Sequence, residues 1–284
     1  MSNIKTLVRG AYDIQKLRIM MGNRIVGNFK AKLGQKPSEK EQELDLEGKK
    51  ILAALRLSYK KITDGVKTFP SQKKFKGDEV ISEYTELVLV DRYIALERDE
   101  AKHFSLLTKV LEDYPVYSAF LKGVKGCGAA MSGVILSEID ISRAKYSSSL
   151  WAYAGLDVAP DGQGRSRHKQ HLVESEYTDR EGEVKKKVGI TFNPFLKTKL
   201  VGVLGSSFLR AGENKYSIIY YEYKNRIENH PKHIEKSKGH RHSMAIRYMI
   251  KRFLVDLYIA WRTIEKLPVA PEYSEAKLGH VHAA

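Results

Sequence analysis

The stretch LKGVKGCGAAMSGVILSEIDISRAKYSSSLWAYAGL, residues 121–156, decides the fold of the C-terminal half of this chain. It places a small-residue turn, Gly126-Cys127-Gly128, between two apolar segments, with Lys122 and Lys125 beside it. Glycines allow a tight turn with positive φ, and they leave peptide N–H groups uncovered where the next helix starts. Such N–H groups bind phosphate oxygens. The pattern predicts a helix-hairpin-helix that grips a nucleic-acid backbone, and the alternative is a glycine loop between core helices.

Residues 1–114 have the periodicity of long helices. Apolar residues recur at three- and four-residue steps from Ile4 to Leu33, which predicts a helix with one apolar face. Long antiparallel helices with little else form helical hairpins that pack on a neighbour or dimerise. We therefore expect residues 1–114 to be a coiled-coil-like helical region and the protein to be a homo-oligomer.

Two further helices are predicted in this region. Ser38 followed by Glu41 forms a capping box, which predicts a second helix that runs to about Asp64. A third helix is expected over residues 78–112. The segment VLVD at 88–91 lies inside it among charged residues at helical spacing, so we interpret it as helix rather than as a strand.

Residues 115–284 are expected to form a second domain that is also mainly helical. The segments LVESEY and VKKKVGIT flank the turn TDREGE, which predicts a β-hairpin over 172–191. Asn193-Pro194 supplies an N-cap and a first-turn proline for a helix to about Arg210. Further helices are expected over 215–229 and 237–266. The predicted fold class is mainly α, with a small β-hairpin insert.

Net charge is the strongest compositional signal, at +15 for 284 residues. Residues 1–120 hold 22 Lys and Arg against 17 Asp and Glu, whereas residues 121–284 hold 27 against 17. The net charges of +5 and +10 concentrate the excess in the C-terminal part. Such an excess indicates a polyanionic partner, usually nucleic acid, and the alternative is a basic protein without one.

Other features exclude several classes of protein. No apolar run approaches the roughly 20 residues of a membrane span, and the polar N-terminus does not resemble a secretory signal. The single cysteine, Cys127, excludes an internal disulfide and suits a reducing compartment. We therefore expect a cytoplasmic protein without a membrane partner.

The candidate nucleic-acid contacts fall in three basic clusters and around the turn. The clusters lie in the glycine-rich loop at 158–171, on a hairpin strand and across 236–255, where no acidic residue occurs. Each cluster alone is also compatible with a solvated face. The residues predicted to contact nucleic acid are Lys122, Lys125, Gly126, Gly128, Arg165, Arg167, Lys169, Lys185, Lys186, Lys187, Lys197, Lys199, Lys238, Arg241, Arg247 and Lys251.

The histidines are distributed unevenly. Eight of the nine fall between 168 and 282, in four pairs. A zinc site needs three or four ligands that converge on one point, and these spacings fit no such motif. No metal site or cofactor is predicted from these residues. The pairs are His168/His171, His230/His233, His240/His242 and His280/His282.

The order of motifs over residues 115–265 resembles the C-terminal domain of the insertion-sequence transposases of the one-ten, one-sixteen and nine-oh-two group. The matching segments are the glycine turn, SSLWAYAGL, GQGRSR, FNPFLKTKLVG and the closing helix HRHSMAIRYMIKRFLVDLYIAW. In that family this domain supplies a serine nucleophile, and an N-terminal domain carries acidic metal ligands. The resemblance thus implies DNA as substrate, a guide RNA as partner and Mg²⁺ as cofactor.

Two departures from the family pattern limit what can be carried over. Residues 1–114 contain no apolar strand that ends in Asp before a Ser/Lys-rich turn, so the acidic metal site is not located. The stretch aligned with the family's serine loop is DGQGRS, in which Ser166 is the nearest hydroxyl. Ser166 beside Arg165 and Arg167 is the candidate nucleophile for a phosphodiester. The alternative is a loop serine that hydrogen-bonds its own backbone.

The sequence therefore predicts a transposase-like DNA-binding protein, derived or truncated, whose metal site comes from a partner subunit. One alternative is a non-catalytic architectural or scaffold protein that originates from a mobile element. Another is a repair-type nuclease tethered by the helix-hairpin-helix, for which Glu138 and Asp140 are the only close acidic pair near the turn.

Overall fold

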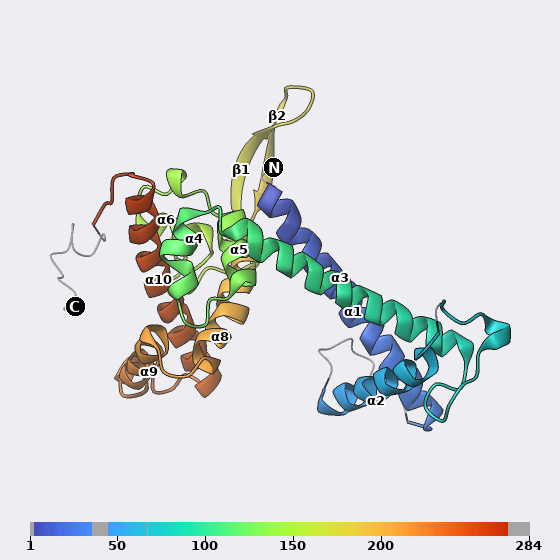
Figure 1. Cartoon of the computed structure of the whole chain (residues 1–284). Helices are drawn as coiled ribbons and strands as arrows, with labels where there is room; N and C mark the ends of the chain where they lie inside the picture. Colours follow the sequence, from blue (N-terminus) through green and yellow to red (C-terminus); the bar gives the residue numbers. More distant parts are fainter. Residues whose placement is uncertain (1–2, 36–44, 67, 272–284) are drawn as a thin grey trace. The chain divides into compact units, whose positions relative to one another are not determined.

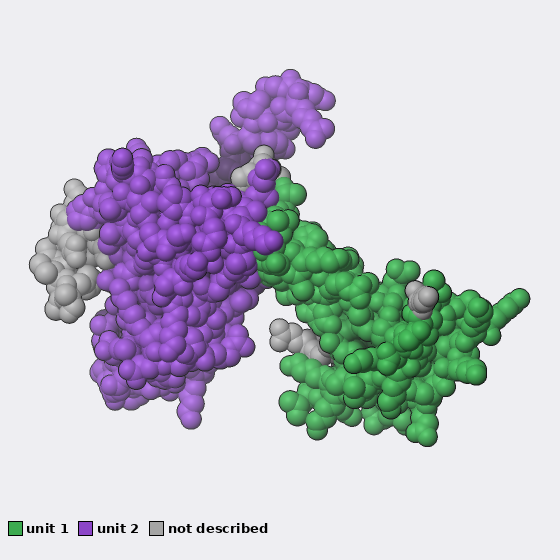
Figure 2. All heavy atoms as spheres, in the orientation of Figure 1, with its two compact units in different colours: residues 1, 6–107 green, residues 2–5, 108–284 purple. Residues whose placement is uncertain are grey.

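The computed structural model describes residues 3–35, 45–66 and 68–271. The described chain is mainly helical, and its sheet has two strands (Figure 1). It divides into two compact units (Figure 2). Unit 1 comprises Thr6–Leu107, and unit 2 comprises Ser2–Lys5 and Thr108–Ala284.

Unit 1 is built from three helices. The helices α1 and α3 run antiparallel, because Arg18 in the middle of α1 binds Glu100 late in α3, while Lys32 at the end of α1 binds Glu86 early in α3. Helix α2 packs against both. The elements are α1 (Asn3–Lys32), α2 (Leu46–Thr63), the short 3-10 helix η1 (Gln72–Lys74) and α3 (Tyr84–Leu111).

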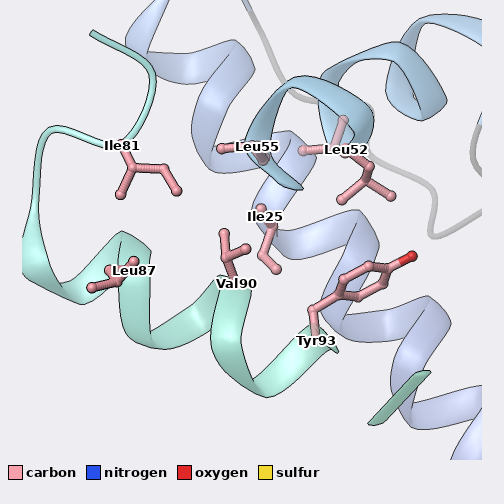
Figure 3. Packing of buried hydrophobic residues seen from close by; sticks show 8 residues of the cluster. Ile25, Leu52, Leu55, Ile81, Leu87, Val90 and Tyr93 are labelled. Atoms are coloured by element: carbon pink, nitrogen blue, oxygen red, sulfur yellow. The ribbon is translucent and has the colours of Figure 1, made fainter. Parts of the chain in front are cut away.

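Apolar side chains from the three helices and from the loop before α3 form the core of unit 1 (Figure 3). Ile25 of α1, Leu52 and Leu55 of α2, and Leu87 and Val90 of α3 are all at most 5% exposed. Burial of such side chains contributes roughly 1.5–3 kcal/mol each to stability. It holds together unit 1, whose described residues form helices and no strand.

The predicted first helix is confirmed, but the second and third start later than expected. Asp45 caps α2 by accepting the Gly48 N–H at 2.6 Å, so the helix begins at Leu46, while Ser38 and Glu41 lie outside the described residues. Asp78 does not begin a helix, because its carboxylate accepts the Val80 and Ile81 N–H groups and the Ser58 hydroxyl. These bonds fix a turn that ties the segment before α3 to α2.

Unit 2 is organised around its last helix, α10, which packs against α4, α6, α8 and α9. Phe253 of α10 is fully buried among Phe120, Phe208 and Tyr216, with ring centroids 5.4–6.4 Å apart. The helical elements are α4 (Pro115–Ala119), η2 (Leu121–Gly123), α5 (Ala129–Glu138), η3 (Ile141–Arg143), α6 (Ser147–Tyr153), η4 (Lys169–His171), α7 (Pro194–Lys197), η5 (Thr198–Leu204), α8 (Gly205–Arg210), α9 (Lys215–Glu228), η6 (Pro231–His233) and α10 (Lys238–Ile264).

The helices predicted after residue 192 are confirmed. Asn193 accepts the Leu196 N–H at 3.0 Å and caps α7, which continues through the π-helical η5 into α8. Asn214 and Ser217 form a capping box at the start of α9. Ser237 caps α10 by accepting the His240 N–H.

The predicted β-hairpin is present as β1 (Val173–Thr178) and β2 (Val184–Gly189), which pair antiparallel. Gly182 lies at the bend with φ 87°. Both strands are exposed along their length, apart from the half-buried Gly189, and the ribbon extends away from the rest of unit 2 (Figure 1).

Candidate nucleic-acid interface

The loop after α6 has a tight, glycine-dependent path. Gly155 has φ 64°, and a Cβ there would lie 2.6 Å from the Phe192 ring, so no other residue fits without strain. Val158 then bridges to Gly164, and the Ala159 N–H donates to the Gln163 carbonyl at 2.7 Å. This turn carries Asp161 and leads the chain directly to Ser166.

Within this loop, Ser166, His171 and Asp161 form a chain of hydrogen bonds. The Ser166 Oγ lies 2.7 Å from Nδ1 of His171, and Nε2 of His171 lies 2.9 Å from Oδ2 of Asp161. The His171 side chain is 2% exposed, whereas Ser166 is half-buried and Asp161 is exposed. The histidine is therefore shielded, and the serine and the carboxylate lie nearer to solvent.

The partners of His171 define its tautomer. Nδ1 accepts the backbone N–H of Ser166 at 3.0 Å, so this nitrogen carries the lone pair. The proton of the neutral ring is then on Nε2 and points to Asp161. The His171 hydrogen bond is the main cause that lowers the pKa of Asp161, and the Gln163 N–H adds to it. A serine hydroxyl on the lone pair of a histidine whose other nitrogen binds a carboxylate is the arrangement of an activated nucleophile.

Cations surround the same loop, and we call Arg165, Arg167, Lys197, Arg247 and Lys251 the cationic cluster. Arg165 binds Asp157 through Nε at 3.0 Å and Nη2 at 2.7 Å. Lys197 donates to the Arg165 carbonyl, and Arg247 lies against Gly164, where a Cβ would be 2.9 Å from its Nη2. The loop, α7 and α10 thus bring together cations that are far apart in sequence.

Electrostatic coupling confirms that these cations share one neighbourhood. Burial, followed by repulsion from Arg247, lowers the pKa of Lys197 to about 8, and Arg167 contributes further repulsion. Burial and Arg247 also lower the pKa of Lys251. Asp157 opposes both shifts. The cluster therefore holds more positive charge than one carboxylate neutralises, which is the condition for binding an anion.

The residues predicted at the glycine turn have other partners. Lys122 makes an ion pair with Glu112 at 2.8 Å, and the Lys125 ammonium donates to the Glu213 carbonyl at 3.2 Å. Gly126 has φ 94° as expected, and a Cβ there would lie 2.9 Å from the Phe208 ring. The expectation of positive φ at Gly128 is wrong: its φ is −75°, and it is the N-cap residue of α5.

The three hairpin lysines do not form one cluster. Successive side chains of a strand point to opposite faces, so Lys186 lies on the face opposite to Lys185 and Lys187. Lys186 pairs with Glu174 at 2.8 Å, and Lys185 pairs with Asp179 and Glu183 of the turn. The strand register thus separates Lys186 from the other two lysines of this run.

The remaining predicted contacts are spread over other elements. Lys199 lies over the Phe195 ring at 5.6 Å, and Arg241 donates to the carbonyls of Ile234 and Lys236. Lys169 begins η4 and is exposed, and Lys238 begins α10 and is also exposed. Among the described residues, no hydrogen bond or ion pair joins Lys169, Lys238 or Arg241 to the cationic cluster.

Sequence reasoning missed the roles of three residues in the loop. Asp157 and Asp161 were not singled out, and His171 was noted only as one member of a pair. The available signal was the spacing Asp161-x4-Ser166-x4-His171 in a glycine-rich segment. That spacing is meaningful only once the turn at 158–164 folds the aspartate back toward the histidine.

The described acidic residues do not fit the Mg²⁺ site that the family resemblance implies. Among them, Asp179, Glu181 and Glu183 are close enough to one another to hold a metal ion. They lie in the hairpin turn, where Lys185 already pairs with two of them. No step of a reaction is therefore assigned to a metal on this chain.

The acidic pair Glu138 and Asp140 also has structural partners. Glu138 is 6% exposed, and its carboxylate accepts the Asn193 amide at 2.7 Å and pairs with Lys5 at 3.4 Å. Asp140 accepts the Ser142 N–H and hydroxyl and caps η3. Both carboxylates thus hold the fold of unit 2.

Comparisons with models of known families, with curated proteins and with solved structures found no match to this chain. None of the described helices has a stretch that is both long and apolar enough to cross a bilayer.

Proposed function

We propose that this protein binds DNA at the cationic cluster and that Ser166 attacks a backbone phosphate in a strand-transfer reaction of the transposase type. The single observation that carries the proposal is the hydrogen-bonded chain from Ser166 through His171 to Asp161, set among cations. The order of family-like motifs over 115–265 supports the same class of reaction, as does the charge excess of residues 121–284.

The chemistry follows from the positions of the protons. Nδ1 of His171 accepts the Ser166 proton while Oγ forms a bond to phosphorus. The bond from phosphorus to the leaving deoxyribose oxygen breaks, and His171 returns the proton to that oxygen. The products are a phosphoserine ester and a free strand hydroxyl, and attack by a second strand hydroxyl reverses the exchange and joins the strands. Arg165 and Lys197 offset the negative charge on the phosphoryl oxygens.

The surroundings favour a phosphate over an acyl substrate. Ser166 donates its own N–H to His171, so this N–H is not available to stabilise the oxyanion of an acyl intermediate. The groups that face the loop are instead the cations of the cluster. A phosphodiester matches that charge, whereas a neutral ester or amide does not.

The implied partners belong to the same proposal. The acidic metal site of the family is not found among the described residues, so we place it on a partner subunit. The guide RNA is implied by the family resemblance, and the homo-oligomer is expected from the long helices of unit 1. The predicted helix-hairpin-helix contact to the DNA backbone also remains part of this proposal, since α4 and α5 flank the Gly126 turn.

The test is the formation of a covalent protein–DNA adduct that survives denaturation. Wild-type protein, supplied with divalent metal and a fluorescent DNA duplex, is expected to give the adduct. Ser166→Ala abolishes it and leaves DNA affinity within about twofold, because the hydroxyl contributes no charge. Ser206→Ala is the matched control, since Ser206 is an exposed serine that bonds the Gly202 carbonyl within its helix. An adduct of equal yield in Ser166→Ala removes this serine from the mechanism.

The second candidate is a non-catalytic, architectural DNA-binding protein. The observation that favours it is the local nature of the hydrogen bonds: Ser166 also accepts the His168 N–H at 3.2 Å, as a serine does when it holds a loop. This function predicts salt-sensitive DNA binding with no adduct from any variant, and loss of loop order in Ser166→Ala.

A further inference from the structure

The segment that joins α2 to α3 in unit 1 is strongly basic. Residues 60–76 contain six lysines and one acidic residue, Asp64. Five of these lysines are described by the structure and all five side chains are exposed. We call them the basic loop: Lys60, Lys61, Lys73, Lys74 and Lys76.

The two ends of this segment are held together. The Ser58 hydroxyl of α2 lies 2.6 Å from Oδ1 and 2.7 Å from Oδ2 of Asp78. Phe75 packs with its ring centroid 5.8 Å from that of Tyr84 at the start of α3. Burial opposes the ionisation of Asp78, but the Ser58 hydroxyl and the Ile81 and Val80 N–H groups outweigh it and lower its pKa. Lys73, Lys74 and Lys76 are thus presented by an anchored loop, and Lys60 and Lys61 by the last turn of α2.

The ammonium groups of the basic loop differ from those of Lys30 and Lys32 at the end of α1, which make ion pairs. Lys30 pairs with Glu47 at 2.9 Å, and Lys32 pairs with Glu86 at 2.8 Å. No ammonium of the basic loop makes an ion pair with any carboxylate in the described ranges. Its charge is therefore available to an external anion.

We propose that the basic loop is a second binding surface for the DNA backbone, separate from the cationic cluster of unit 2. This proposal depends on the proposed function for one point only, namely that the polyanion is DNA. All of its cations are lysines, whose compact ammonium groups contact phosphates as point charges and read no base. The exposed Phe69, at 43%, adds an apolar contact for the sugar edge.

Two cationic surfaces on one chain give a bivalent DNA-binding protein. A duplex that contacts both surfaces binds with the combined strength of the two. The partner is DNA rather than an anionic membrane, because the proposed function of the cationic cluster already requires DNA. A membrane is one outcome of the test below.

The experiment measures fluorescence anisotropy of the full chain with 15- and 60-base-pair duplexes between about 50 and 200 mM salt. The loop variant replaces all five lysines of the basic loop with Gln. We expect it to lose about tenfold or more in affinity for the long duplex and to lower the slope of log affinity against log salt by about 4. A control variant replaces five other exposed lysines with Gln and so has the same change of net charge. Its affinity for the long duplex is expected to fall by less than about threefold. Its positions are Lys16, Lys49, Lys50, Lys102 and Lys109.

The fold of each variant is checked by its thermal transition. Should the fivefold variant not fold, the triple variant of Lys73, Lys74 and Lys76, which leaves α2 intact, is expected to lower the salt slope by about 2 to 3. Equal affinity of the loop and control variants for the long duplex overturns this proposal and leaves the proposed function in place. Loss of binding to phosphatidylserine vesicles with DNA affinity unchanged overturns it in favour of a membrane.

A further variant separates the two proposals. Lys197→Gln combined with Lys251→Gln removes charge from the cationic cluster alone. If this variant keeps full affinity while the loop variant loses it, the basic loop is the DNA site and the proposed function of the cationic cluster fails.

Discussion

Charged residues are arranged in opposite ways in the two units. In unit 1, several cations of α1 and α2 pair individually with carboxylates of α3, as in Arg18 with Glu100 and Arg56 with Glu97. In the cationic cluster of unit 2, several cations share Asp157, and burial lowers the pKa values of Lys197, Arg247 and Lys251. Repulsion from Arg247 adds to the shifts of the two lysines.

This difference separates the charged residues that stabilise the fold from those that are placed to bind a ligand. Matched pairs between helices align the helices and leave little net charge for a partner. Crowded cations with one carboxylate cost folding free energy, and a bound polyanion recovers that cost.

The largest expected effect is on the rate at which the covalent protein–DNA adduct forms. His171→Asn removes the ring nitrogen that accepts the Ser166 proton and is expected to slow adduct formation by about 10²- to 10⁴-fold, with DNA affinity nearly unchanged. His242→Asn is the matched control, because His242 contacts the Tyr220 hydroxyl at 2.6 Å and is remote in sequence from the loop. Equal rates in the two variants would remove His171 from the reaction.

The next effect concerns the core of unit 1. Leu87 is fully buried, and Leu87→Ala is expected to lower the free energy of unfolding by about 2–5 kcal/mol. Leu89→Ala, two residues away and 37% exposed, is expected to cost less than about 1 kcal/mol. Urea denaturation measures both. The adduct rate of the folded variants should not change, and a slower rate would show that the apolar core of unit 1 also serves the reaction.

A smaller effect of mixed sign is expected at Asp157. Asp157→Asn leaves Arg165 without its counter-ion and is expected to destabilise unit 2 by about 1–2 kcal/mol. The same change makes the cationic cluster more positive, so DNA affinity at low salt rises. Asp99→Asn on α3 removes an exposed pair with Lys102 and should cost less than about 0.5 kcal/mol. Loss of DNA affinity in Asp157→Asn contradicts the role given to the cluster.

The smallest effect is a pH dependence of binding. Because the pKa of Lys197 is lowered to about 8, its ammonium is present at pH 7 and is lost as the pH rises through 8. DNA affinity is therefore expected to fall several-fold, at most about tenfold, between pH 7 and 9. Lys197→Arg abolishes this decline, since Arg stays protonated, and Lys199→Arg on the following turn retains it. A decline that persists in Lys197→Arg assigns the titration to another group.

Much of the helical fold follows from local signals in the sequence. The apolar period of α1 and the caps at Asn193 and Ser237 act within a few residues, so the pattern alone locates these elements. The start of α3 is different, because Asp78 looks like a helix start but is held in a turn by Ser58, which is 20 residues away. No local pattern contains that contact.

The candidate site was predicted only in part for the same reason. Ser166, Arg165 and Arg167 are close in sequence and were identified together. Lys197 and Arg247 reach the loop because α7 and α10 pack beside it, and the role of His171 depends on the turn at 158–164. Tertiary packing brings these residues together. A count of basic residues in the sequence cannot distinguish this cluster from the separated lysines of β2.

The attachment point of DNA on the protein is the most direct measurement of the central claim. Wild-type protein is incubated with a fluorescent DNA duplex and divalent metal, digested with protease and nuclease, and examined by peptide mass spectrometry. The account predicts a nucleotide phosphate esterified to Ser166 in the segment that contains Gly164 and His171. A phosphate on any other side chain, or no covalent nucleotide under conditions where strands are exchanged, would contradict it.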